Sequence, residues 1–143
     1  MQINNVLAKH QLVPLMFMQD AVADAQSAVA LYSAQVHGAV ALTTIGYVMP
    51  FAGEVVGVSI GLDLAGTQGS LTVVPTIDTV VCTDLSAAIA TSAVKASDDC
   101  KRGSNPFAKN ALIGAKVTTA GSWDGTTADL TVTVWVILSI SGI

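Results

Sequence analysis

The chain has 143 residues, of which 52% are hydrophobic and 11% are charged, and its formal net charge is −4. An ordinary soluble domain carries roughly 25% charged residues, so we expect much of this exterior to be buried against other copies of the chain or a larger assembly. The acidic balance argues against a nucleic-acid-binding protein, and no stretch is long and apolar enough to span a membrane as a helix.

Residues 1–35 predict an N-terminal arm. Between residues 15 and 33 the apolar side chains recur at spacings of three and four, which predicts a short helix. Residues 28–36 also alternate as in a strand, so an extended arm is the alternative. The apolar stripe is a candidate contact between subunits, and packing on its own domain is the alternative. The stripe residues that we assign to this contact are Leu15, Met18, Val22, Val29 and Tyr32.

Residues 36–143 predict one all-β domain, because the apolar period changes to two near residue 40. Residues 85–94 fit either a helical turn or a further strand. Antiparallel strands joined by short and long turns favour a two-sheet, jelly-roll-like β-sandwich. An immunoglobulin-like sandwich is disfavoured, because both tryptophans follow the second cysteine. Strands are expected at residues 39–49, 54–64, 70–76, 79–83, 112–119 and 128–140.

Basic residues are concentrated in one part of this domain. Five of the six Lys and Arg residues fall between positions 95 and 116. We take Lys101 and Arg102 as a candidate contact with an acidic partner surface, and a solvated loop is the alternative.

The sequence predicts neither an enzyme nor a cofactor or metal site. A GxSxG pattern at residues 57–61 lies inside a predicted strand, and no histidine follows Ser59, so it does not predict a hydrolase. Its two glycines should instead leave room on one sheet face for a neighbouring side chain. The two histidines and two cysteines lack the spacing of a metal site. A disulfide between Cys82 and Cys100 is an open alternative that needs an oxidising compartment.

Two blocks of the sequence resemble β-sandwich domains of tailed-phage structural proteins, and together they cover about a third of the chain. Residues 45–62 are similar to the opening hairpin of those domains, in which an aromatic-x-x-Pro-x-Ala-Gly turn leads into a Val-Gly-Val-Ser strand. Residues 112–136 are similar to the closing hairpin, in which Thr-Thr, Trp and Thr-Thr-Ala-Asp precede the last strand. We expect Trp123 in this block to cap the open end of the sandwich, with a ligand or receptor contact as the alternative.

The resemblance implies a virion structural protein, namely a capsid cement or decoration protein. It implies the major capsid protein as partner, a homotrimer, and a place on the capsid exterior after synthesis in the host cytoplasm. It implies no cofactor, no membrane and no nucleic acid. The alternative that it leaves open is a head-fibre, tail-fibre or spike domain that binds a host receptor. Residues 82–109 depart from the family pattern, and we expect any function peculiar to this protein there.

Overall fold

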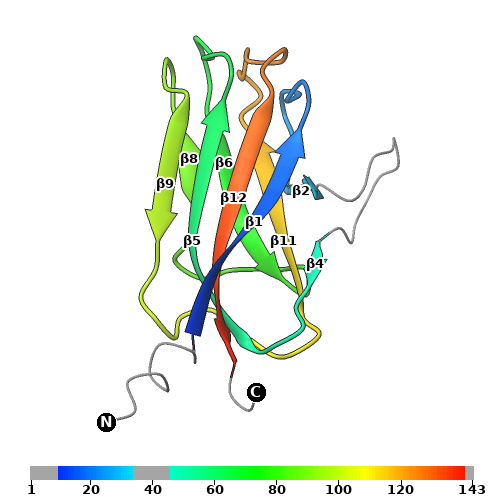
Figure 1. Ribbon diagram of the computed structural model, residues 1–143. Coiled ribbons are helices and arrows are strands. Elements are labelled where there is room, and N and C mark those ends of the chain that lie inside the picture. Colours follow the sequence, from blue (N-terminus) through cyan, green and yellow to red (C-terminus); the bar gives the residue numbers. More distant parts are fainter. Residues whose placement is uncertain (1–9, 34–45, 141–143) are drawn as a thin grey trace.

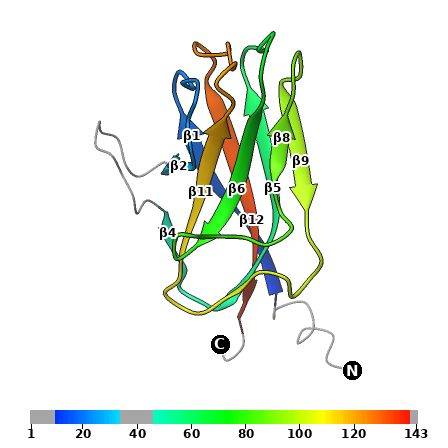
Figure 2. The same ribbon diagram turned by 180° about the vertical axis from the view of Figure 1, so that it is seen from behind.

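The computed structural model describes residues 10–33 and 46–140, in which every regular element is a strand. Two antiparallel sheets pack face to face (Figures 1 and 2), which confirms the predicted β-sandwich. Sheet A contains β1 (His10–Gln19), β3 (Tyr32–Ser33), β5 (Gly53–Leu62), β9 (Lys95–Asp99), β10 (Pro106–Phe107) and β12 (Leu130–Ser139). Sheet B contains β2 (Val29–Ala30), β4 (Tyr47–Val48), β6 (Leu71–Ile77), β7 (Val80–Val81), β8 (Ala87–Ile89) and β11 (Leu112–Thr119).

The strand order is that of a jelly roll. Sheet A runs β3-β1-β12-β5, and both β9 and β10 pair with the remaining edge of β5. In sheet B, β2 and β4 share one edge of β11, while β7 and β8 share the far edge of β6. The two sheets therefore read β1-β12-β5-β9 and β2/β4-β11-β6-β8, in which most neighbours are distant along the chain.

The helix expected within residues 15–33 is wrong. Residues 10–19 form β1 instead, and all ten of them pair with β12, from His10↔Ser139 to Gln19↔Leu130. The next segment cannot be helical, because Ala21, Ala25 and Ala28 have φ values of 49°, 50° and 49°. Pairing of ten residues with the distant strand β12 outweighs the helical preference indicated by the local spacing of apolar residues.

A separate arm through residues 1–35 is also wrong where the structure describes it. Residues 10–33 supply β1 and β3 to sheet A and β2 to sheet B, so they belong to the sandwich. Residues 1–9 and the first part of the strand expected at 39–49 lie outside the described residues. The other expected strands are present as β5, β6, β7, β11 and β12, and residues 85–94 contain the short strand β8.

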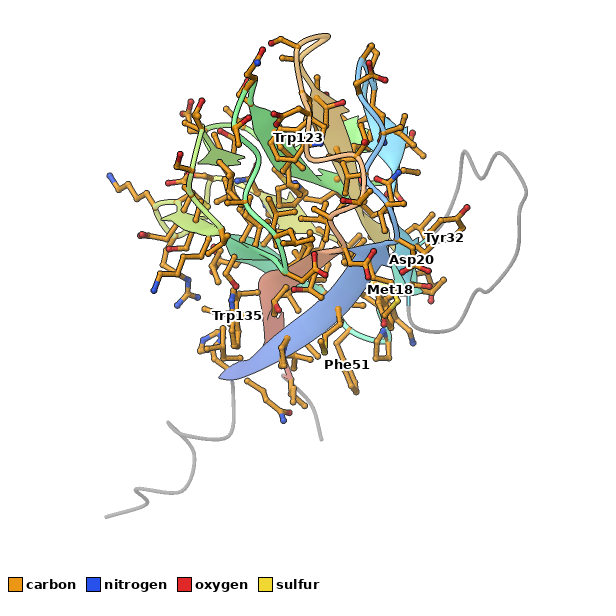
Figure 3. All side chains as sticks on the ribbon, turned by 90° about the horizontal axis from the view of Figure 1, so that it is seen from above. Met18, Asp20, Tyr32, Phe51, Trp123 and Trp135 are labelled. Atoms are coloured by element: carbon orange, nitrogen blue, oxygen red, sulfur yellow. The ribbon has the colours of Figure 1, made fainter. Side chains whose placement is uncertain are left out.

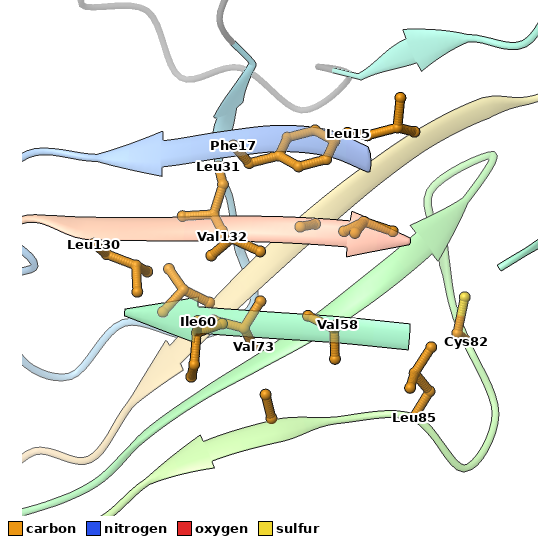
Figure 4. Close-up of a cluster of buried hydrophobic side chains, with 14 of the residues drawn as sticks. Leu15, Phe17, Leu31, Val58, Ile60, Val73, Cys82, Leu85, Leu130 and Val132 are labelled. Carbon is orange, nitrogen blue, oxygen red and sulfur yellow. The ribbon is translucent and has the colours of Figure 1, made fainter. Parts of the chain in front are cut away.

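The core lies between the sheets and is built from the inward residues of each strand (Figure 4). Alternation is clearest in β12, where Val132, Val134 and Val136 are buried. Burying one such side chain contributes about 1.5–3 kcal/mol. The largest fully buried side chains are Phe17, Leu31, Leu71, Ile89, Ile113 and Leu130.

Trp123 closes one end of this core, as predicted. Its ring is buried, and its indole N–H donates to the carbonyl of Val22 at 3.1 Å. A side chain at Gly125 would collide with the ring, and at Gly69 it would collide with the Trp123 backbone. The glycines around this loop therefore let the chain close over the indole.

Candidate interaction surface

The seven residues predicted to make contacts do not form one surface. Leu15 and Val22 are core residues, with 6% and 0% of their surface exposed. Met18 and Tyr32 face each other across β1 and β3 (Figure 3). Val29 is exposed but belongs to sheet B. Of the predicted stripe, the structure therefore brings together only Met18 and Tyr32 at the surface.

The outer face of sheet A, which we define by the outward residues of β1, β12 and β5, is apolar and partly exposed. Leu12, Met16 and Met18 are 56%, 51% and 38% exposed. Leu12 and Met16 lie outside the predicted stripe, although both faces of β1 are apolar in the sequence, as in strands that are covered on both sides. The outward residues are Leu12, Pro14, Met16 and Met18 on β1, Thr131, Thr133, Trp135 and Ile137 on β12, and Glu54, Gly57, Ser59 and Gly61 on β5.

Trp135 on this face contacts two residues of β5. Its cross-strand partner is Gly57, where a Cβ would lie 3.6 Å from the Trp135 ring. The indole N–H donates to the Ser59 hydroxyl at 3.2 Å. A Cβ at Gly57 or Gly61 would make only ordinary contacts, so the space predicted from these glycines is not required by the neighbours that the structure describes. Ser59 is a partner of the indole.

The free edge of β1 is poorly suited to accept another strand. Within the described residues, β3 pairs only with Phe17 and Met18, so most of β1 has an open edge. The Tyr47 hydroxyl donates to the Met16 carbonyl on that edge at 3.1 Å. Pro14 lies two residues before Met16, so its backbone faces the same open edge of β1. Proline has no N–H to donate to an added strand. A partner would therefore contact the face of sheet A rather than its edge.

The long strands carry almost no charge. Among β1, β5, β6, β11 and β12, the Asp, Glu, Lys and Arg residues are only Glu54 and Lys116. Both are held by the same chain: Glu54 pairs with Arg102, and the Lys116 ammonium donates to the Thr79 carbonyl at 3.0 Å. These five strands thus carry little charge, whereas β9 at the margin of sheet A carries Lys95, Asp98 and Asp99.

Apart from those in β9, the charged side chains of the described residues lie mostly in the loops. At the Trp123 end, the loops at 20–28, 63–70, 90–94 and 120–129 contain five aspartates and no basic residue. Three of these carboxylates accept hydrogen bonds from a neighbouring loop; Asp124, for example, accepts the N–H groups of Thr67 and Gln68 at 2.8 and 3.0 Å. The Thr67 hydroxyl, followed by these N–H groups, lowers the pKa of Asp124. Asp63, Asp124 and Asp129 thus hold neighbouring loops together.

At the opposite end, residues 100–111 contain Lys101, Arg102 and Lys109 and no acidic residue. Burial by itself would raise the pKa of Glu54, but the Gly103 N–H at 2.5 Å and the Arg102 guanidinium outweigh it and lower that pKa. Arg102 therefore fastens its loop to β5, while Lys101 is exposed to solvent. The two residues predicted as one contact have different surroundings.

Comparison with known proteins does not assign the chain to a family: no family model matches it, and no curated protein matches it. The described part of the chain contains no helix that could cross a membrane. In the same residues, no three side chains of the metal-binding types lie together.

Proposed function

We propose that this protein is a capsid cement or decoration protein of a tailed phage, which binds the assembled head and stabilises it. The observation that carries the proposal is the exterior of the sandwich, whose five long strands present only two charged side chains: Glu54, which pairs with Arg102, and Lys116, which donates to a backbone carbonyl. Such a surface suits burial against neighbouring subunits better than solvation. The exposed row of Leu12, Met16 and Met18 gives this surface its most apolar part.

The fold and the two sequence blocks support the same proposal. Residues 45–62 cover β4 and β5, and residues 112–136 cover β11, the Trp123 loop and most of β12. The resemblance to phage sandwich domains thus falls on central strands of both sheets. Jelly rolls occur in viral capsid and lectin domains, and this support is analogy at the level of the fold.

The proposed mechanism is binding alone, without a catalysed reaction. A protein that binds only the assembled shell stabilises it by mass action. Apolar area removed from water contributes roughly 25 cal/mol per Å², and the outer face of sheet A supplies such area without the cost of burying an unpaired charge. Copies of the chain would form a trimer through heterologous contacts that close a ring.

The test is the amount of this chain relative to the major capsid protein in purified particles, measured by quantitative mass spectrometry. A ratio near one copy per capsid subunit, or a simple fraction of it, is the expected result, because a cement protein repeats with the lattice. A handful of copies per particle would instead indicate a fibre, spike or tail component. Absence from particles would overturn the proposal.

A further inference from the structure

The fold brings the two cysteines to the same end of the sandwich and anchors each to a different sheet. Cys82 follows β7, and its N–H donates to the Pro75 carbonyl on β6 at 2.9 Å. Cys100 follows β9, and its N–H donates to the Val56 carbonyl on β5 at 3.1 Å. Since β6 belongs to sheet B and β5 to sheet A, the two cysteines extend from different sheets.

One buried amide connects their surroundings. The Asn105 side-chain oxygen accepts the Thr83 N–H at 2.7 Å, and its nitrogen donates to the Thr83 carbonyl at 3.0 Å. The same nitrogen lies 3.4 Å from the Cys100 sulfur. Asn105 therefore touches both the sulfur of Cys100 and the residue directly after Cys82.

The two thiols are free and differ in access to solvent. Cys82 is buried beside Leu85 at the margin of the core (Figure 4), whereas Cys100 is partly exposed. Burial raises the pKa of Cys82 to about 12, and the nearby Cys100 adds to the shift. A reagent from solvent would thus meet Cys100 first, while Cys82 stays a protonated thiol inside the protein.

We propose that Cys82 and Cys100 are a modification site at which a small disulfide, such as oxidised glutathione, produces an intramolecular disulfide. The Cys100 sulfur attacks the glutathione disulfide, which gives a mixed disulfide and one glutathione. The Cys82 thiol then loses its proton, its sulfur attacks the Cys100 sulfur, and the departing glutathione thiolate takes up a proton. Because Cys82 is buried and protonated, this second step is the slower one. The protein thiols lose two electrons and two protons, which the two glutathione thiols carry away. The new bond ties the β7–β8 connection of sheet B to the end of β9 in sheet A.

The experiment treats the folded protein with oxidised glutathione and digests it with trypsin without reduction. Cleavage after Lys95 and Lys101 places the cysteines on separate peptides, so a linked pair of peptides reports the bond. The unmutated protein should lose both thiols, retain no glutathione and give the linked pair. Cys82→Ala should stop at the mixed disulfide on Cys100, and Cys100→Ser should keep its buried thiol.

Three results would overturn the proposal: both thiols persist, glutathione stays on Cys100 in the unmutated protein, or two molecules become joined through Cys100. A second measurement needs no variant. The linked protein should melt about 5–10 °C above the reduced protein, because the bond closes a short loop in the unfolded chain. An unchanged melting temperature would contradict a disulfide that links the two sheets.

Discussion

The Glu54 carboxylate is the clearest case of a single side chain that fastens a loop to a sheet. Because its folded pKa is lowered, its contribution to stability is present above the unfolded pKa and is lost as the pH falls through the folded value. Glu54→Gln should therefore reduce the free energy of unfolding by about 1–2 kcal/mol at pH 7. The difference from the unmutated protein should vanish well below pH 4.5, the ordinary value for glutamate.

Urea unfolding at a series of pH values measures this difference. Asp99→Asn, which removes an exposed carboxylate on the neighbouring strand, is the matched control and should show little change at any pH. A gap between Glu54→Gln and the unmutated protein that persists unchanged at acid pH would contradict the assignment.

Three alanines in the segment from β1 to β2 have left-handed backbone conformations, which an L residue adopts at a cost of about 1 kcal/mol. Ala25→Gly and Ala28→Gly should each raise the free energy of unfolding by about 0.5–1 kcal/mol, because glycine adopts this φ without strain. Ala23→Gly is the control, since Ala23 does not have positive φ. It should be neutral or destabilising. Equal effects at all three positions would show that the strain is absent.

At the scale of the element, the packing of β1 shows whether the N-terminal region is a separate arm or part of the sandwich. Phe17 points inward and is fully buried, while the adjacent Met18 points outward. Phe17→Ala should cost about 3–5 kcal/mol, whereas Met18→Ala should cost under about 1 kcal/mol. Thermal unfolding monitored by circular dichroism measures both. Similar, small losses for the two variants would mean that β1 is not packed in the sandwich.

Deletion of residues 1–35 is a second test of the pairing between β1 and β12. Removing residues 1–35 takes away β1, which pairs with every residue of β12, along with Leu31 and Val22 of the core. We expect this truncated chain not to fold, which limited proteolysis would reveal as rapid cleavage throughout. A truncated chain that resists protease would restore the idea of a separable arm.

The strands that could be predicted are those whose period is strictly two. β12 has buried valines alternating with Thr131, Thr133 and Trp135, so its face and extent can be read from the sequence. In β1 both faces are apolar, so the same residues also match a helical stripe, and its partner lies more than a hundred positions away. β8 and β10 have three and two residues. Strands this short are placed by their neighbours rather than by their own pattern.

At the scale of the whole molecule, the composition correctly indicated a surface with few charges, but its location depended on the fold. Met18 and Tyr32 were predicted because they fit a stripe, and they lie together only because β3 returns beside β1. Leu12 and Met16 extend that surface through pairing with β12, which no local pattern reveals.

The outer face of sheet A is tested by placing a charge on it. Met16→Glu should weaken binding to shells at least tenfold without changing the melting temperature, because a carboxylate buried at a contact loses its hydration. Val80→Glu is the control, since Val80 is similarly exposed but lies on β7 of sheet B. Co-sedimentation with shells lacking the protein measures binding. Full binding by Met16→Glu would exclude this face, and equal losses in both variants would indicate a general effect of charge.

The proposed trimer is open to a direct measurement. Light scattering coupled to size exclusion should give three times the mass of one chain at high concentration, with a shift toward monomer on dilution. A strictly monomeric protein would confine the trimer to the capsid surface or refute it.

The pairing of β1 with β12 also sets an order of events during synthesis. Sheet A has its first described strand at its centre next to its last, so neither can settle until nearly the whole chain has left the ribosome. Contacts of such long sequence separation make folding slow. Throughout that interval β1 exposes apolar residues on both faces, which is the condition under which nascent chains aggregate. Production of this protein in quantity should therefore depend more on temperature and chaperone supply than on the stability of the finished sandwich.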